Sequence, residues 1–347
     1  MGTGERLLEV KNLSVEFQTR KGIVRAVDCV SFCLEKGKTL AIVGESGSGK
    51  SVSAMSVLRL LDDNGRIVDG EILFETENGK VDLAKLPMEK MYGIRGNRIS
   101  VIFQEPMTAL NPVFTIARQL SEPFWIHRGM SKREAQKEGL KMLEAVRIPN
   151  PERVMREYAH QLSGGMRQRV MIAMALACKP EILIADEPTT ALDVTIQAQI
   201  LRLMRRLQTE NGTAVLFITH DLGVVHEVAD EVAVMYCGQV VERVPAYTVF
   251  QSDGYSHPYT EGLLNSVPSE KNAGKRLDSI PGNVPSPFQI PKGCRFAPRC
   301  KYCTEQCVRE LPELTEVKSG HFVRCFYANK GDRNSEEHGR FVIGEGN

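Results

Sequence analysis

A glycine-rich stretch near the N-terminus has the residue types and the spacing of a phosphate-binding loop. Its glycines let consecutive backbone N–H groups curve around a polyphosphate, because no Cβ atom obstructs the approach. We expect Lys50 to reach the β- and γ-phosphates and the Ser51 hydroxyl to ligate Mg²⁺. An incidental Gly/Ser turn is the alternative interpretation. The complete motif is Gly44-Glu45-Ser46-Gly47-Ser48-Gly49-Lys50-Ser51.

Two carboxylates far downstream form a second element that could act on phosphate. Asp186 and Glu187 directly follow Glu181–Ala185, an apolar run typical of a buried strand. Ligands of open α/β sheets bind at this end of a strand. Asp186 is suited to hold Mg²⁺ through a water molecule, and Glu187 to polarise an attacking water. An Asp-Glu pair alone is more commonly a solvated turn, so its value depends on the phosphate loop.

A Ser-Gly-Gly turn forms a third element suited to an anion. Ser163, Gly164 and Gly165 come just before a helical run from Met166 to Cys178. They offer a hydroxyl, bare amides and the positive end of a helix. Because the chain already has its own phosphate loop, this second anion site is expected to serve another nucleotide. Ser163 is also expected to be the N-cap of the helix, and the two roles do not conflict.

Short strands and helices are predicted around these motifs. Thr39–Val43 is an apolar, strand-like run before the phosphate loop, and Ser51–Leu58 has apolar residues at helical spacing. Ile99–Phe103 and Ala214–Ile218 are also strand-like. The phosphate loop therefore joins a strand to a helix, as its chemistry requires.

The predicted elements group into one α/β core with a helical insert. Residues 7–105 and 180–243 are rich in predicted strands, and residues from about 107 to 178 are mainly helical. Within the insert, Ser131 and Glu134 predict a capping box at the start of an amphipathic helix. Phe124 and Trp125 could line a groove there, although large aromatic residues more commonly pack in a core.

In their order along the chain, the motifs resemble those of the ATP-hydrolysing subunits of ABC transporters. The resemblance covers residues 7–245, and Leu162–Met166 matches the LSGGQ-like signature with Met in place of Gln. It implies a P-loop NTPase fold of the ABC type over residues 1–245, with a helical subdomain at about 107–178. It also implies that two cassettes close head to tail around ATP and separate after hydrolysis, which makes the chain an ATPase.

The resemblance assigns roles to further residues. Gln104 matches the loop glutamine that touches Mg²⁺ and senses the membrane partner, and His220 matches the histidine that contacts the γ-phosphate. Asp193 matches a loop aspartate that faces the opposite subunit. Phe17 occupies the position of an aromatic residue that stacks on adenine, and an edge-strand core residue is its alternative role. With Lys50, Ser51, Asp186 and Glu187, these residues would bind ATP and Mg²⁺ and catalyse hydrolysis.

Three further segments resemble the ATPase subunits of bacterial dipeptide and oligopeptide importers. They are Gln104–Pro112, Ser256–Thr260 and the extension Pro281–Cys325. Relatives with the same phrases handle nickel or glutathione, so the cargo stays open. The importer-type extension is expected to cover residues 246–328, and the polar residues 329–347 are expected to form a poorly ordered tail.

The extension is rich in cysteine: five of the nine cysteines lie between residues 294 and 325. In a cytosolic chain, clustered cysteines favour a metal over disulfides. The importer resemblance implies a 4Fe-4S cluster at Cys294, Cys300, Cys307 and Cys325. Four thiolates also suit Zn²⁺, spacing alone does not separate the two, and a site without metal is a third possibility. Cys303 departs from the family pattern, either as a substitute ligand or as a bystander.

The overall composition bears on partners and location. The formal net charge is +1 without a block of like charges, so nothing suggests nucleic acid or an anionic membrane surface as the main partner. The longest apolar run, Val170–Cys178, is shorter than the roughly 20 residues that span a bilayer. The N-terminus also lacks the apolar core of a signal peptide. Together with the importer resemblance, these features imply a peripheral protein on the cytoplasmic side of the bacterial cell membrane.

The family resemblance supplies the partners of such a protein. They are two transmembrane permease subunits, an extracellular substrate-binding protein and a second ATPase subunit, either a different chain or a copy. Contact with the membrane would pass through the permeases alone. A soluble ABC ATPase of repair or translation, acting on nucleic acid, is the competing class. Its members tend to have two cassettes in one chain or long coiled-coil arms, and this sequence has neither.

Overall fold

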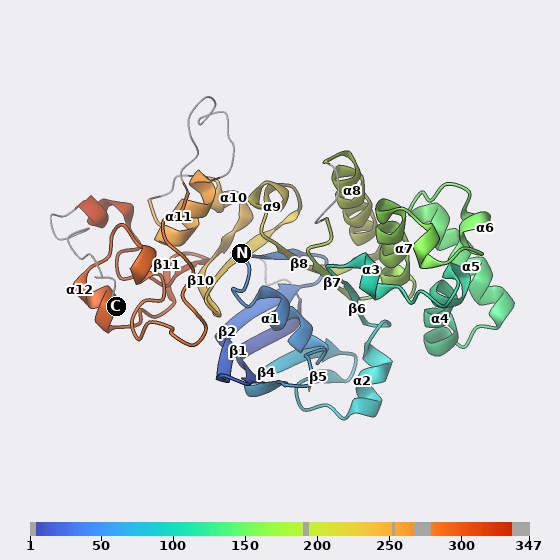
Figure 1. Ribbon diagram of the computed structural model, residues 1–347, viewed down its shortest axis with the longest axis horizontal. Helices are drawn as coiled ribbons and strands as arrows, with labels where there is room; N and C mark the ends of the chain where they lie inside the picture. Colours follow the sequence, from blue (N-terminus) through green and yellow to red (C-terminus); the bar gives the residue numbers. More distant parts are fainter. Residues whose placement is uncertain (1–4, 190–193, 252–253, 267–278, 335–347) are drawn as a thin grey trace. The chain divides into compact units, whose positions relative to one another are not determined.

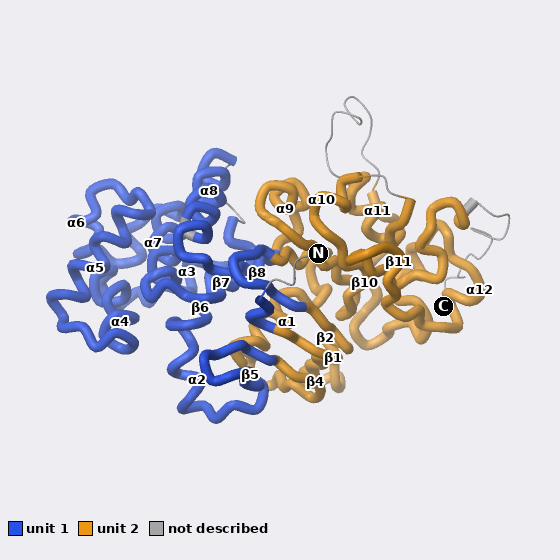
Figure 2. The backbone as a smooth tube through the Cα atoms, turned by 180° about the vertical axis from the view of Figure 1, so that it is seen from behind, with its two compact units in different colours: residues 1–8, 33–39, 73–218 blue, residues 9–32, 40–72, 219–347 orange. Residues whose placement is uncertain are grey.

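The computed structural model divides the chain into two compact units, each assembled from segments far apart in the sequence (Figure 2). Unit 1 comprises residues 1–8, 33–39 and 73–218, and unit 2 comprises residues 9–32, 40–72 and 219–347. The described residues are 5–189, 194–251, 254–266 and 279–334. The phosphate loop belongs to unit 2, and the Asp186-Glu187 pair belongs to unit 1.

Unit 2 contains the strand that leads into the phosphate loop. This strand, β3 (Thr39–Val43), is buried throughout and pairs in parallel with β9 (Glu231–Tyr236). The neighbours continue outward as β10 (Gln239–Pro245), β12 (His321–Val323) and β11 (Thr315–Lys318), all antiparallel. The last strands of the chain therefore extend the same sheet that positions the loop.

The apolar core of unit 2 includes residues from both sides of position 245, where the predicted cassette ends and the predicted extension begins. Val43 of β3 and Val234 of β9 share one buried cluster with Tyr259 and Phe296 from the C-terminal region. Tyr259 lies on α11 (Pro258–Asn265) and is fully buried. Each large buried side chain contributes roughly 1.5–3 kcal/mol relative to exposure. The C-terminal region is thus part of the core that supports the phosphate loop.

A second sheet contains the N-terminal strands. Its order is β2 (Gly22–Glu35), β1 (Arg6–Thr19) and β4 (Gly65–Thr76). The end of β4 pairs antiparallel with β5 (Gly79–Asp82) in unit 1, where Leu73 faces Asp82. Buried and more exposed residues alternate along β2, as expected for a strand with one face on a core.

Unit 1 has three parallel strands, β6 (Ile99–Ile102), β7 (Ile182–Asp186) and β8 (Ala214–Thr219). All residues of β7 and β8 are buried, which is typical of parallel strands covered on both faces. The predicted strands at these positions are confirmed, each to within a residue at either end. Because the strands are parallel, the residues that follow β6 and β7 lie at the same edge of the sheet.

One helix of unit 1, α5 (Lys132–Ala145), begins with the predicted capping box. Ser131 is the N-cap of the helix that ends at Ala145, and the Ser131 and Glu134 side chains each bond the backbone N–H of the other. Such a cap stabilises a helix by about 1 kcal/mol. The α-helices, labelled in Figure 1, are α2 (Met88–Ile94), α3 (Pro106–Ala109), α4 (Ile116–Arg128), α5 (Lys132–Ala145), α6 (Pro151–Val154), α7 (Gly164–Leu176) and α8 (Val194–Asn211). A short 3-10 helix, η1 (Ala159–Gln161), precedes α7.

Aromatic residues of α4 pack within unit 1. Phe124 is buried with Ala135 of α5 and Ala177, which follows α7. Trp125 is partly buried and packs against the same cluster. These contacts give both aromatics the packing role that is usual for residues of their size.

Short helices complete unit 2. They are α1 (Lys50–Val57), α9 (Leu222–Val228), α10 (Ala246–Val249), η3 (Ala297–Arg299), α12 (Glu305–Arg309) and η4 (Lys330–Asn334). The last of these falls where a poorly ordered tail was expected to begin. Arg333 of η4 is buried, and its guanidinium donates to Tyr327 O at 2.9 Å and to the Glu261 carboxylate at 2.8 Å. The tail was expected to be poorly ordered from residue 329, and this anchoring explains why residues 330–334 form a helix instead.

Candidate nucleotide-binding and catalytic site

The phosphate loop connects β3 to α1 and depends on glycine at two of its positions. Gly44 has φ 152° and Gly49 has φ 97°. A Cβ atom at Gly44 would lie 2.2 Å from the carbonyl oxygen of Met235, and one at Gly49 would lie 2.6 Å from that of Ala26. Both obstacles are backbone atoms and cannot move aside easily. The loop therefore needs glycine for its backbone angles and for its packing.

Lys50 begins α1 and lies inside the loop. Its side chain is only 5% exposed, and Nζ donates to Gly44 O at 2.8 Å and to Glu45 O at 3.0 Å. The N-cap residue of α1 is Gly49, which has no side chain to cap the helix, and the first turn has no acidic residue. The amides and the positive end of this helix thus suit an anion, together with the Lys50 ammonium. The expected roles of Lys50 and Ser51 remain predictions.

Two residues from the C-terminal region, neither of them predicted as a site residue, hold this loop. The backbone N–H of Glu45 donates to Tyr259 Oη at 2.8 Å. The Arg299 guanidinium donates to both carboxylate oxygens of Glu45, at 2.6 and 3.0 Å. Tyr259 lies within the importer-like phrase Ser256–Thr260, but no sequence signal connects either partner to the loop.

Unit 1 brings Gln104 and Glu187 together. Both follow parallel strands, and Gln104 Nε2 donates to Glu187 Oε2 at 3.3 Å. Asp186 ends β7, is 5% exposed and pairs in register with Ile218. Glu187 has φ 45°, in the left-handed region, and its N–H donates to Ile218 O at 3.0 Å. Non-glycine residues seldom adopt this conformation, and it is found at functional sites.

The remaining predicted residues lie at separate positions. Ser163 is the N-cap of α7, and its Oγ accepts from Met166 N at 3.3 Å, as predicted. His220 follows β8 and is exposed. The Phe17 ring packs against Gly65, where a Cβ atom would lie 2.6 Å from Phe17 Cε1. Asp193 lies outside the described residues. Two expectations stay predictions. One is the stacking of Phe17 on adenine, and the other is that the phosphate loop and Asp186 bind the same nucleotide and Mg²⁺.

Four of the five clustered cysteines face one small cavity in unit 2. It measures about 10 Å³, and its lining includes Cys294, Cys300, Cys307 and Cys325. Cys303 does not line it: this side chain is 2% exposed, and its Sγ lies 3.6 Å from Thr304 O. The four predicted ligands therefore line the same cavity, and Cys303 does not.

The thiols as placed do not form a metal-binding group. Among the described residues, no three His, Cys, Asp or Glu side chains are arranged to hold a metal ion. The support for the expected 4Fe-4S cluster is thus limited to the shared cavity, which admits about one water-sized sphere. Burial, with a smaller effect from the neighbouring thiols, raises the pKa of Cys294 to about 12. A neutral thiol packs as a small apolar group.

Comparison with known proteins identifies the family. Residues 27–190 match the ABC transporter family, and residues 241–307 match the C-terminal region of oligopeptide/dipeptide transporters. An AAA domain family also matches residues 155–226. The oligopeptide transport ATP-binding protein AppD of Bacillus subtilis is 50% identical over 331 residues, which cover 95% of this chain and 99% of AppD. The chain belongs to the ABC transporter ATP-binding proteins.

Solved structures of ABC cassettes agree with this assignment. The dimeric cassette MJ0796, determined in a post-hydrolysis state with ADP and Pi, is 29% identical with a TM-score of 0.61, covering 69% of this chain and 99% of MJ0796. The cbiO1 protein of Clostridium perfringens, part of an ABC transporter complex, is 27% identical with a TM-score of 0.58, covering 71% and 91%. This ABC protein therefore has the P-loop ABC ATPase fold and is an ATPase.

None of the helices within the described residues of this ABC protein is both long and apolar enough to cross a bilayer.

Proposed function

We propose that this ABC ATPase drives the import of dipeptides or oligopeptides through a membrane permease. The match of residues 241–307 to the C-terminal region of oligopeptide/dipeptide transporters supports this cargo most directly. The 50% identity to AppD across nearly the whole chain points the same way. The cassette would occupy residues 1–245 with its helical subdomain at about 107–178, and the importer-type extension residues 246–328.

ATP hydrolysis would follow from positioning and charge stabilisation, as in other phosphoryl transfers. Lys50 and Ser51 would hold the phosphates and Mg²⁺, with Asp186 binding Mg²⁺ through water. Glu187 would polarise the attacking water, and its hydrogen bond to Gln104 would fix the carboxylate at the strand edge. His220 would contact the γ-phosphate.

Two cassettes would close head to tail, so that the signature of one covers the ATP of the other. Ser163 presents a hydroxyl at the start of α7, and a Cβ atom added at Gly164 would meet nothing within 4 Å. These residues, with Gly165 and Asp193, would contact the partner's nucleotide. The γ-phosphate would join the subunits, and its loss would separate them.

The cassette pair would act beneath two transmembrane permease subunits on the cytoplasmic side of the cell membrane. An extracellular substrate-binding protein would deliver the cargo, and the second ATPase would be a different chain or a copy. Co-purification with an integral membrane complex distinguishes this assembly from a soluble ABC ATPase that acts on ribosomes or DNA.

Glu187→Gln tests the hydrolysis cycle. Removing the carboxylate should lower turnover by about a hundredfold or more while ATP still binds, because a positioned base contributes factors of this size. The closed pair should then accumulate with ATP, as measured by phosphate release and by size-exclusion chromatography. Adding Ser163→Ala and Gly165→Asp should disperse the pair. Adding Ser131→Ala, which removes the N-cap of α5, should not.

Two outcomes would contradict this cycle. Near-normal hydrolysis by Glu187→Gln would remove Glu187 from the role of base. A pair that survives the Ser163 and Gly165 replacements would contradict the head-to-tail arrangement.

We further infer that Cys294, Cys300, Cys307 and Cys325 hold a metal centre, which the importer resemblance suggests is a 4Fe-4S cluster. The shared cavity supports this ligand set, and Cys303 lies outside it. A metal would supply folding energy to a loop-rich segment that has little secondary structure. Zn²⁺ is the alternative for the same four thiolates.

Protein purified without oxygen tests the metal centre. A 4Fe-4S cluster should give a brown colour and visible thiolate-to-iron absorbance that Cys300→Ser abolishes. Cys303→Ser should retain them, since this thiol does not line the cavity. A colourless protein with stoichiometric zinc would contradict the cluster, and a protein without either metal would contradict the centre itself.

A further inference from the structure

Two side chains of the C-terminal region, Arg299 and Tyr259, form hydrogen bonds with the phosphate loop. We propose that they are positioning residues for nucleotide binding. The proposal rests on the ATPase activity of the cassette and not on the identity of its cargo. All groups involved lie within unit 2.

The ion pair between Arg299 and Glu45 is bidentate and largely shielded from water. The Arg299 side chain is 4% exposed and that of Glu45 is 30% exposed. Arg299 Nε also donates to Pro281 O at 2.9 Å, and Nη1 lies 3.4 Å from Tyr236 Oη. A planar guanidinium held at these points has one orientation, and so does the carboxylate that it meets.

Tyr259 fixes the backbone of the same loop residue. Its Oη accepts from Glu45 N–H at 2.8 Å, and its fully buried ring packs on Tyr236 and Phe296 with centroids 4.7 and 5.5 Å away. The carbonyl oxygen of Glu45 in turn accepts from Lys50 Nζ. Every polar group of Glu45 thus has a partner, and one of these partners is the lysine expected to meet the phosphates.

These contacts would prepare the loop before nucleotide arrives. A loop already held in its binding conformation loses less conformational freedom when it binds, which increases affinity. Removing the pair should therefore raise Kd and KM for ATP more than it lowers kcat. A hydrogen bond to a charged group is large enough for a change on the order of tenfold in affinity.

Arg299→Gln in the full chain tests the proposal, with Arg295→Gln as the matched control. Arg295 is also on the C-terminal region and partly buried, but it pairs with Asp28 and Cys237 O, neither of which belongs to the loop. We expect Arg299→Gln to weaken binding of a fluorescent ATP analogue about tenfold. Arg295→Gln should bind it as the unmodified protein does, even if both variants melt at a lower temperature.

Glu45→Gln keeps the test decisive if Arg299→Gln does not fold. It should reproduce the loss of ATP affinity, and the double variant should lose no more than either single one. Unchanged ATP affinity in Arg299→Gln or Glu45→Gln would overturn the proposal. Equal losses in Arg299→Gln and Arg295→Gln would also overturn it, since they would indicate general destabilisation.

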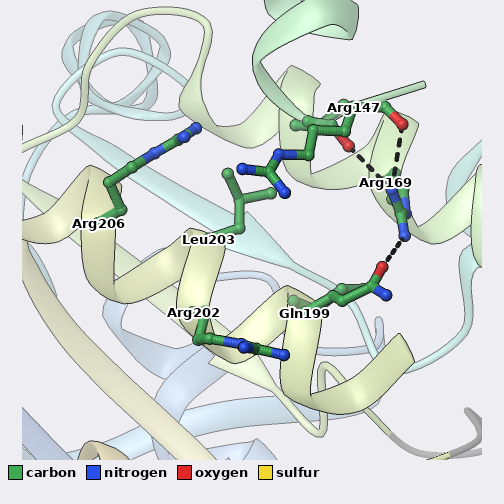
Figure 3. Close-up of a pocket in the computed structure, with 8 residues that line it drawn as sticks. Arg147, Arg169, Gln199, Arg202, Leu203 and Arg206 are labelled. Atoms are coloured by element: carbon green, nitrogen blue, oxygen red, sulfur yellow. Dashed lines mark hydrogen bonds between the residues drawn. The ribbon is translucent and has the colours of Figure 1, made fainter. Parts of the chain in front are cut away.

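A separate observation concerns a basic cavity in unit 1, and here we propose a site for a small anion with two or more phosphate groups. The cavity measures about 410 Å³, within the range of small-molecule sites. Four arginines from α7, α8 and the turn after α5 line it, and its lining within the described part of the chain includes no carboxylate (Figure 3). The arginines are Arg147, Arg169, Arg202 and Arg206.

The arginines differ in how they are held. Arg169 donates to Val146 O at 3.3 Å, to Arg147 O at 3.1 Å and to Gln199 Oε1 at 2.6 Å, so its position is fixed. Arg147 has φ 57°, and its side chain has no hydrogen-bonding or ionic partner among the described residues. Figure 3 shows it extending over Leu203, between Arg169 and Arg206.

Charge and geometry together favour phosphate as the ligand. Arg206 has one acidic neighbour, Glu210 at 3.7 Å, so the lining keeps an excess of positive charge. Like charges in one cavity repel, and an anion would offset that repulsion. Guanidinium forks match phosphate oxygens in pairs, which favours a ligand with several phosphate groups.

Calorimetric titration with inorganic pyrophosphate tests this site. The Glu187→Gln protein saturated with Mg-ATP keeps the nucleotide sites filled. We expect binding that Arg147→Gln with Arg202→Gln weakens tenfold or more and that Arg133→Gln, an exposed position elsewhere on α5, leaves unchanged. Absence of binding at millimolar pyrophosphate, undiminished binding in the double variant, or equal binding of citrate would overturn the proposal.

Discussion

The phosphate loop must keep its amides directed at an anion although its glycines leave the backbone free to move, and contacts from outside the loop resolve this conflict. Within the loop, Lys50 bonds the carbonyls of Gly44 and Glu45. From outside, Tyr259 bonds the Glu45 amide and Arg299 bonds its carboxylate. The predicted nucleotide-binding loop is thus contacted by a region more than two hundred residues downstream.

The fold explains how so distant a region reaches the loop. Strand β12 pairs with β10, and Tyr259 and Phe296 share a core with Val43, so the C-terminal region is built into unit 2. The short helix η3 ends at Arg299, and the next residue, Cys300, lines the cysteine cavity. One turn of chain therefore joins the loop contact to the thiol cluster.

Local features of the fold followed from the sequence, because short-range signals determine them. Apolar runs located β3 and β7, and cap residues located the starts of α5 and α7. The contact of Glu45 with Arg299 spans 254 residues and has no local signal. The same holds for the arginine cavity. The predicted cysteine set did come together, but spacing could not reveal whether the thiols surround an ion.

Residue-resolved hydrogen exchange in the nucleotide-free protein tests the central claim most directly. The Glu45 amide donates to a buried tyrosine hydroxyl, whereas Ser46 and Gly47 are exposed. If outside contacts hold the loop, the Glu45 amide should exchange far more slowly than those of Ser46 and Gly47. Exchange at Glu45 as fast as at Ser46 would show that the loop is not held before nucleotide binds.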